Sequence, residues 1–183
     1  MKSKPCRLKF TLAYSVLFLL AGIGCTNSPQ PNISIKTEPL IRIEDTATGQ
    51  TGYRNSRHET VIPAGKYTMC MTDTFCSHAI VLSKDDQKWL VIDREEKVLY
   101  EVFPYDNGPD YPSEGLFRIV KDGKIGYADA NTYAIVIPPQ FDCAYPFENG
   151  KAKVSTRCTS SKDGEHTVWT SDAWQYLDKK GGL

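Results

Sequence analysis

Residues 124–154 read KIGYADANTYAIVIPPQFDCAYPFENGKAKV, and this stretch decides the fold class. It combines short runs of β-branched and aromatic residues with turn-forming glycine, asparagine, aspartate and proline. The double proline at 138–139 ends a strand, because proline has no N–H to donate to a neighbouring strand. The Asn149-Gly150 pair favours a two-residue hairpin, since that turn requires positive φ at both positions. The stretch therefore predicts antiparallel β-hairpins.

The beginning of this stretch recurs elsewhere in the chain. Residues 124–129 (KIGYAD) align with residues 88–93 (KWLVID) and 173–178 (AWQYLD), at offsets of 36 and 49 positions. Residues two apart on a strand share a face, so Trp89 and Tyr127 are expected to fill equivalent layers. We expect both to be largely buried, each close to the start of a strand.

Two weaker similarities extend the repeat. Residues 113–119 align with 148–154, and Gly52-Tyr53 is followed by an Ile-Pro pair as in the main stretch. No segment after the first 37 residues shows sustained 3.6-residue apolar periodicity, the pattern of a helix. We therefore predict an all-β fold of antiparallel hairpins, built from about three to four degenerate repeats that stack because one unit cannot bury its apolar face alone.

The order of motifs resembles that of the WG-repeat β proteins of bacteria. Their unit reads roughly as W-G or a variant, then I/L-D, I-P-P, an aromatic-Asp pair and a phenylalanine with E-G. The closest copy is Ile125-Gly126-Tyr127-Ala128-Asp129, followed by IPPQFD at 137–142 and FENG at 147–150, with Ile125 in place of tryptophan. The resemblance covers about residues 50–183. It implies a β-repeat fold and a binding or scaffold role rather than one chemistry.

The N-terminus has the features of an export signal. Four basic residues precede an apolar run over residues 10–24, which as a helix would span roughly 22 Å, less than the roughly 30 Å core of a bilayer. The run ends in LAGIGC at residues 20–25, which resembles the lipobox of bacterial lipoproteins. The alternative is an ordinary secretory signal, in which Cys25 carries no lipid.

These features divide the chain into three parts. Residues 1–24 are assigned to a lipoprotein signal peptide with a helical core, 25–45 to the lipid-anchor cysteine and a flexible tether, and 46–183 to the WG-repeat-like β domain. Lipidation of Cys25 with chains such as palmitate would hold the protein at a membrane of the cell envelope. Thr26 follows Cys25, so the outer membrane, facing the periplasm or the surface, is favoured if the cell is Gram-negative.

Four cysteines remain after Cys6 and Cys25. An even number in an exported chain points to disulfides, and we favour the two local pairs Cys70–Cys76 and Cys143–Cys158. Free thiols are one alternative. A zinc site that uses Cys70, Cys76 and His78 is another, although a C-x5-C-x-H spacing is unusual for zinc.

The sequence contains no recognisable catalytic motif, cofactor loop or metal site, so we expect a protein without enzymatic activity and without a cofactor. Without the first 24 residues, the formal charge is −4, which does not favour nucleic acid as a partner. The acidic loop at 106–114 lacks the ligand spacing of a calcium loop. Aromatic residues flank this loop and are candidates for an exposed binding groove, or else for the core: Phe103, Tyr105, Tyr111 and Phe117.

Three functions are left open. The leading hypothesis is a non-enzymatic scaffold or protein-binding lipoprotein that binds another envelope or exported protein. An immunity-type lipoprotein that neutralises an exported toxin belongs to the same class. An envelope hydrolase, or another enzyme with an unrecognised site, is the alternative from a different class. A surface rich in tyrosine and tryptophan would favour binding, and a deep pocket with perturbed acidic groups would favour an enzyme.

Overall fold

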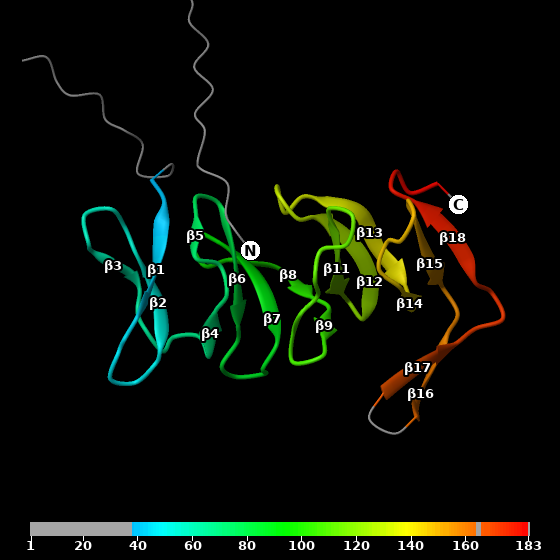
Figure 1. Cartoon of the computed structure of the whole chain (residues 1–183), viewed down its shortest axis with the longest axis horizontal. Helices are drawn as coiled ribbons and strands as arrows, with labels where there is room; N and C mark the ends of the chain where they lie inside the picture. The colour runs from blue at the N-terminus through cyan, green and yellow to red at the C-terminus, as the bar shows by residue number, and fades with distance from the viewer. Residues whose placement is uncertain (1–37, 164–165, 183) are drawn as a thin grey trace, which may run out of the picture.

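The computed structural model describes residues 38–163 and 166–182, and every regular element in these residues is a β-strand (Figure 1). The strands pair antiparallel throughout, which confirms the predicted all-β fold. No helix in the described part of the chain is long and apolar enough to span a membrane. The predicted signal peptide, Cys25 and the tether as far as residue 37 lie outside the described residues.

The longer strands form four units along the long axis of the molecule (Figure 1). Unit 1 contains β1 (Leu40–Glu44), β2 (Thr51–Arg54) and β3 (Thr60–Ile62). Unit 2 contains β6 (His78–Leu82), β7 (Trp89–Asp93) and β8 (Val98–Val102). Unit 3 contains β11 (Leu116–Lys121), β12 (Lys124–Asp129) and β13 (Ile135–Phe141). Unit 4 contains β15 (Lys151–Ser155) and β18 (Gln175–Asp178).

Shorter strands connect the units. Between units 1 and 2 lie β4 (Met69–Cys70) and β5 (Thr74–Phe75). Between units 2 and 3 lie β9 (Pro104–Tyr105) and β10 (Gly108–Pro109). Around unit 4 lie β14 (Cys143–Ala144) and the projecting hairpin of β16 (Thr159–Asp163) and β17 (His166–Thr170).

Units 2 and 3 share one sheet. Its strand order is β13-β12-β11-β8-β7-β6-β4, and β8 joins β11 through the pairs Val102↔Ile119 and Glu101↔Val120. Unit 1 belongs to a sheet of order β3-β2-β1-β5, and unit 4 to one of order β14-β15-β18. Two further hairpins, β9–β10 and β16–β17, complete the described strands.

A hydrophobic core lies between each pair of successive units, where the two units pack together. Successive side chains on a strand point to opposite faces, so a strand between two units contributes to two cores. In β6, Ala79 and Val81 pack towards unit 1, while Ile80 packs towards unit 3. In unit 3, Ala128 packs towards unit 2 and Tyr127 towards unit 4. Stacking thus buries apolar faces that a single unit would expose.

An aspartate at the end of the central strand, or in unit 1 the asparagine directly after it, closes the turn that follows. In unit 3, Asp129 Oδ1 accepts hydrogen bonds from the N–H groups of Asn131 (2.9 Å) and Thr132 (2.8 Å). Short side-chain acceptors of this kind stabilise turns because they satisfy backbone donors locally. The same role falls to Asn55 in unit 1, Asp93 in unit 2 and Asp178 in unit 4.

Steric hindrance explains why the repeat has a glycine in its central strand. A Cβ on Gly126 would lie 2.5 Å from both the Ile137 carbonyl oxygen and the Pro139 nitrogen. A Cβ on Gly52 would meet the Ile62 carbonyl oxygen at 2.4 Å. In both units the Ile-Pro segment of the returning strand therefore lies directly against the central strand, where a side chain does not fit.

The burial of the predicted repeat aromatics is confirmed. Trp89 begins β7 and is 8% exposed, and it lies in the core between units 2 and 3. Tyr127 is buried in the core between units 3 and 4. Its position in the middle of β12, however, differs from the expected position near a strand start.

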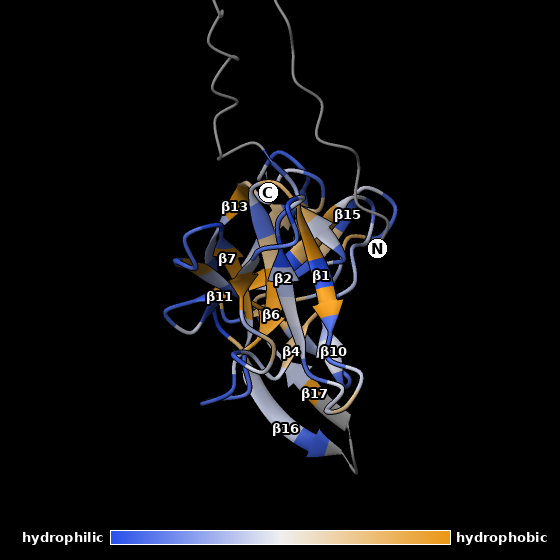
Figure 2. Cartoon of the chain, turned by 90° about the vertical axis from the view of Figure 1, so that its left-hand side faces the viewer, coloured by the Kyte–Doolittle hydropathy of each residue, from blue (hydrophilic) through white to orange (hydrophobic). Residues whose placement is uncertain are grey.

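The predicted start of the β domain at residue 46 is too late. Strand β1 occupies part of the segment predicted as tether, and its Leu40 is fully buried with Tyr53 and Ile62. The outer face of this strand carries the half-exposed Ile41 at the end of the stack, where Figure 2 shows apolar residues on β1. The short LIRIE run has no clear strand pattern in the sequence, because the charged Arg42 and Glu44 interrupt its apolar residues.

Candidate binding surface

The loop that follows unit 2 presents two exposed tyrosines. Tyr105 lies in β9 and Tyr111 follows β10, and their side chains are 53% and 68% exposed. Their rings meet edge to face with centroids 6.3 Å apart. Tyrosine combines a large apolar ring with a hydroxyl group, so this pair offers both contact area and hydrogen bonding to another molecule.

A buried ion pair holds this loop against unit 3. Asp110 accepts hydrogen bonds from Arg118 Nε at 3.0 Å and from Nη2 at 2.5 Å, and also from the Arg118 backbone N–H at 2.8 Å. Nη1 of Arg118 donates to the Ala144 carbonyl at 3.2 Å. This two-pronged contact fixes orientation as well as distance. Both oxygens of Asp110, the most buried carboxylate in the acidic loop, are therefore engaged by Arg118.

The same guanidinium group connects the tyrosines to further aromatic rings. Arg118 Cζ lies 4.3 Å from the centroid of the Phe103 ring and 5.7 Å from that of Tyr105. A cation over a ring face is attracted by the negative π surface. Arg118 thus fixes both the acidic loop and the two rings that border it.

Aromatic contacts continue from Phe103 to unit 4. Phe103 meets Trp169 of β17 at 5.8 Å, Trp169 meets Tyr145 at 5.3 Å, and Tyr145 meets Trp174 at 5.6 Å between ring centroids. All four rings are half-buried or exposed. We call the whole set the aromatic strip: Tyr111, Tyr105, Phe103, Trp169, Tyr145 and Trp174.

A lysine adds positive charge at the unit 4 end of the strip. Lys153 Nζ lies 4.5 Å from the centroid of Trp174 and 5.8 Å from that of Tyr145. Lys153 pairs with Tyr176 across the β15–β18 ladder, and Tyr176 is 60% exposed. The strip therefore ends in a cation beside exposed aromatic surface.

The predicted Cys143–Cys158 disulfide is present and supports this arrangement. Its Cα atoms are 6.0 Å apart, an ordinary separation for a disulfide. Cys143 lies in β14 and Cys158 directly precedes β16. The bond therefore ties the base of the projecting hairpin, which carries Trp169, to the sheet of unit 4.

The predicted Cys70–Cys76 disulfide is wrong. Cys70 is a free, buried thiol, and Cys76 is disulfide-bonded but not to Cys70. Cys70 lies in β4, which pairs with β6, whereas Cys76 follows β5, which pairs with β1. The chain crosses from one sheet to another between the two cysteines, so sequence proximity does not bring them together. A disulfide-bonded Cys76 also lacks the thiolate that the zinc alternative requires.

Three of the four predicted surface aromatics, Phe103, Tyr105 and Tyr111, lie in the strip. The fourth, Phe117, is 2% exposed and packs in the core between units 2 and 3, which corrects its assignment to the binding surface. Phe117 pairs with Ala128 across β11 and β12, and both side chains lie on the face of the sheet that is buried in this core. The sequence did not assign Trp169, Tyr145 or Trp174 to a site, although aromatic density near the C-terminus was a signal.

Burial shifts the titration of several groups away from the strip. Burial raises the pKa of the Cys70 thiol and of the Tyr53 and Tyr127 hydroxyls, so these groups stay protonated at neutral pH. Burial lowers the pKa of His78, whose Nδ1 is buried without a hydrogen-bond partner in the described residues. His78 is thus less exposed than its polar sequence context suggests.

Comparison with known proteins adds one finding on the repeat. No curated protein and no solved structure matches the chain. The family model of the WG containing repeat matches residues 126–157, which run from the β12 glycine to the residue before Cys158. That match coincides with the part of the chain in which Gly126, the Ile-Pro segment and Tyr127 pack as described above. Residues 126–157 are therefore a WG-containing repeat.

Proposed function

We propose that this protein is a non-enzymatic binding module, anchored to a membrane of the cell envelope through a lipid on Cys25, and that it binds another envelope or exported protein. In a Gram-negative cell its place is the outer membrane. The observation that carries the proposal is the aromatic strip. Its rings form two groups in contact, Tyr105 with Tyr111 and Phe103 through to Trp174, which Arg118 connects. They remain partly exposed, instead of being distributed singly over the surface.

The composition of the strip suits a protein partner. Tyrosine, tryptophan and arginine are enriched where proteins meet, because they provide large contact areas with few rotatable bonds. Tyr105 and Tyr111 provide exposed rings with hydroxyl groups, and Lys153 provides a cation that can meet a carboxylate. The underlying Arg118–Asp110 pair keeps the loop in one conformation, which reduces the entropy lost on binding.

A comparison of crosslinked partners tests this proposal. Cells that express the tagged protein are treated with a short crosslinker, and the envelope proteins recovered with the tag are quantified by mass spectrometry. We expect at least one envelope or exported protein to be recovered with the wild type and to fall at least about tenfold with the double variant Tyr105→Ala, Tyr111→Ala. Such a loss corresponds to about 1.4 kcal/mol of binding free energy.

The matched control is the double variant Met69→Ala, Met71→Ala. Met69 lies in β4 and Met71 directly follows this strand, so both are outside the strip. Each methionine is 43% exposed. Recovery of the same proteins with the control variant is expected. If the strip variant and the control variant recover the same proteins in the same amounts as the wild type, the strip is not the binding surface and the proposal fails.

A further inference from the structure

Strand β18 is the counterpart of the central strands of the other units. Each of β2, β7 and β12 has a paired strand on both sides, namely β1 and β3, β6 and β8, or β11 and β13. β18 pairs with β15 alone among the strands in residues 38–163 and 166–182 (Figure 1). One edge of β18 is therefore open in the described structure. An open edge presents unpaired N–H and C=O groups, to which an extended chain can hydrogen-bond.

The turn after β18 matches the turns after the other central strands. The Asp178 N–H donates to the Gly182 carbonyl at 2.8 Å, as the Asp129 N–H donates to Ala134 at 2.9 Å. This bond places the backbone groups of Asp178 on the edge of β18 away from β15. Backbone groups alternate in direction along a strand, so those of Tyr176 point to the same open edge.

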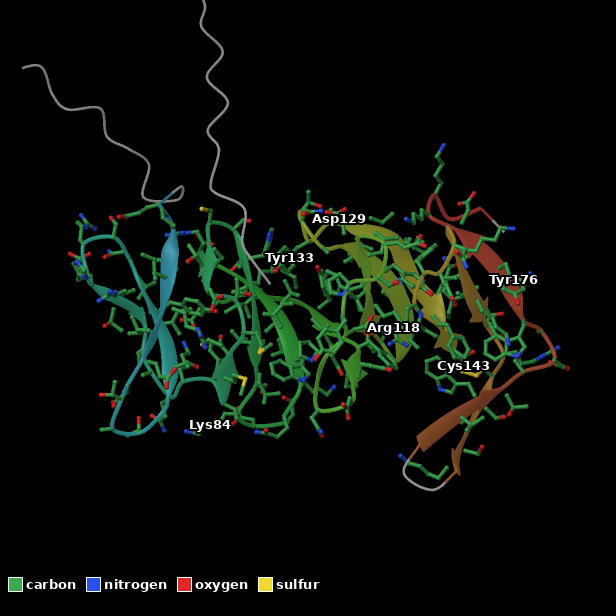
Figure 3. All side chains as sticks on the ribbon, in the orientation of Figure 1. Lys84, Arg118, Asp129, Tyr133, Cys143 and Tyr176 are labelled. Atoms are coloured by element: carbon green, nitrogen blue, oxygen red, sulfur yellow. A yellow bond between two sulfur atoms is a disulfide. The ribbon has the colours of Figure 1, made fainter. Side chains whose placement is uncertain are left out.

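The side chains on this end of unit 4 are also uncovered. Tyr176 aligns with Tyr127 of unit 3 and Tyr53 of unit 1. Tyr127 is 1% exposed and Tyr53 is 0% exposed, because the next unit covers each of them. Tyr176 is 60% exposed and lies at the end of the stack (Figure 3). Leu177, on the opposite face of β18, is buried against unit 3.

We propose that β18 is a strand-addition site, at which a partner protein contributes one extended segment that pairs antiparallel with β18 and covers Tyr176. The inference rests on the proposed function, since it names how the partner of the aromatic strip binds at the adjacent unit 4. In strand addition, backbone hydrogen bonds contribute affinity and the flanking side chains contribute specificity.

The residue at position 175 specifies the kind of segment. The returning strands of units 1 and 3 carry an Ile-Pro segment that lies against Gly52 or Gly126, where a Cβ does not fit. Unit 2 has Leu90 at the equivalent position, and its returning strand β8 has no proline and pairs directly through Leu90↔Glu101 and Val91↔Tyr100. Unit 4 has Gln175 there. The partner segment is therefore a proline-free, β-branched and aromatic strand like β8.

Peptides copied from the chain test this inference. One labelled peptide has the sequence of residues 96–103, which contains β8 and no proline, and a second has that of residues 134–141, which contains β13. Each is titrated with the purified protein while the anisotropy of the label is measured. The β8 peptide is expected to bind, and the β13 peptide to bind at least about tenfold more weakly, because its Ile-Pro segment meets the Gln175 side chain.

Changes to the peptide backbone and to Tyr176 distinguish strand addition from simple apolar contact. The β8 peptide with N-methyl groups at alternate backbone nitrogens, prepared in both frames, is expected to lose binding in one frame. Tyr176→Pro removes an edge donor and should abolish binding of the β8 peptide without lowering the melting temperature, since proline is accepted at an edge that faces solvent. Tyr176→Ala keeps the donor and should weaken binding only in part.

Several results would overturn the inference. No binding of the β8 peptide up to about 1 mM, the weak end of specific affinity, rejects it, and so does equal binding of both N-methylated peptides. Self-association in sedimentation equilibrium that Tyr176→Pro abolishes would make a second copy the occupant, and would also reject the partner segment. If the peptides fail while Tyr105 and Tyr111 still govern partner recovery, strand addition is wrong and the proposed function stands.

Discussion

The hydroxyl of Tyr127 donates a 2.7 Å hydrogen bond to the backbone carbonyl of Tyr145, which follows β14. Its ring packs edge to face against Phe147 with centroids 4.9 Å apart. In unit 1, Tyr53 makes the equivalent bond to the Thr72 carbonyl at 2.8 Å and the equivalent ring contact with Phe75 at 4.9 Å. The tyrosine of the repeat therefore joins its own unit to the segment that leads into the next one.

Removal of the Tyr127 hydroxyl should lower stability. Tyr127→Phe leaves the Tyr145 carbonyl without this donor, and we expect the free energy of unfolding to fall by about 1 kcal/mol. Tyr176→Phe is the matched control, because Tyr176 has the aligned position but is exposed, and it should cost almost nothing. Urea unfolding of both variants measures the difference. Equal losses in the two variants would contradict the equivalence of the units and the open end of unit 4.

Truncation of Trp89 should be more damaging. Trp89 lies in the core between units 2 and 3, so Trp89→Ala is expected to reduce the free energy of unfolding by about 3–5 kcal/mol. The half-buried Trp174 has the aligned position in unit 4, and Trp174→Ala should cost clearly less. Thermal melts of the two variants provide the comparison. A melting temperature unchanged by Trp89→Ala would mean that this residue does not act as a core residue.

The sequence predicted those features of the fold that depend on local pattern. The strand pattern around Trp89 and Tyr127, and the turn aspartates such as Asp129, follow from short-range spacing and side-chain chemistry. The cross-unit contacts do not. Phe103 meets Trp169 only because the disulfide of Cys143 and the projecting hairpin place β17 beside the loop after unit 2. Such long-range placement leaves no local signal in a single sequence.

The cysteines should differ in their availability to alkylating reagents. In denaturant without reductant, Cys70 should be alkylated while Cys143 and Cys158 should not, because the last two form a disulfide. In the native protein, alkylation of Cys70 should be slow, since burial raises its pKa and conceals the thiol. Peptide mass spectrometry reads out each site, and repetition after reduction is the control. An unalkylated Cys70 in denaturant would contradict the free thiol.

Loss of the Cys143–Cys158 disulfide should reduce stability. The bond between Cys143 and Cys158 spans a sequence separation of 15 residues. The chain-entropy model assigns about 3 kcal/mol to a loop of that length. We expect the double variant Cys143→Ala, Cys158→Ala to unfold at lower urea concentration by a corresponding amount. An unchanged midpoint of urea unfolding would show that the disulfide does not stabilise the fold by restricting the conformations of the unfolded chain.

Acidification should destabilise the fold through His78. Burial lowers the pKa of His78, although the charge of the paired Asp93 acts in the opposite direction. Below the unfolded-state pKa of about 6.5, the unfolded chain binds a proton that the folded protein does not, so stability falls as the pH falls. His78→Gln should reduce the loss in melting temperature between pH 7.5 and about pH 5. An identical pH dependence in both proteins would exclude this role.

The proposed anchor gives a prediction that is independent of the fold. Cys25→Ala should release the protein from membranes into a soluble extracytoplasmic fraction, because an acyl chain contributes about 0.8 kcal/mol per buried methylene group. Detergent partitioning and labelling with a fatty-acid analogue measure the change, and Cys70→Ala serves as the control that keeps the anchor. Membrane association that survives Cys25→Ala, with no loss of acyl label, would refute the lipid anchor.

Prediction of the candidate surface succeeded only in part, for a physical reason. Phe103, Tyr105, Tyr111 and Phe117 are similar in sequence context, yet Phe117 faces a core because its strand β11 lies inside the seven-stranded sheet, between β12 and β8. Tyr105 is exposed because it lies in a separate two-stranded hairpin. Composition cannot distinguish the two positions. The strand order of the sheet decides which aromatic residue is covered.

The four units are equivalent, and the last leaves one strand edge open in the described structure. Amide hydrogen exchange tests this arrangement most directly. The backbone N–H groups of Tyr53 and Tyr127 lie in strands paired on both sides, whereas that of Tyr176 faces the open edge of β18. Exchange measured by NMR at these three residues should be slow at Tyr53 and Tyr127 and close to the unprotected rate at Tyr176. Protection of Tyr176 as strong as that of Tyr127 would contradict the account.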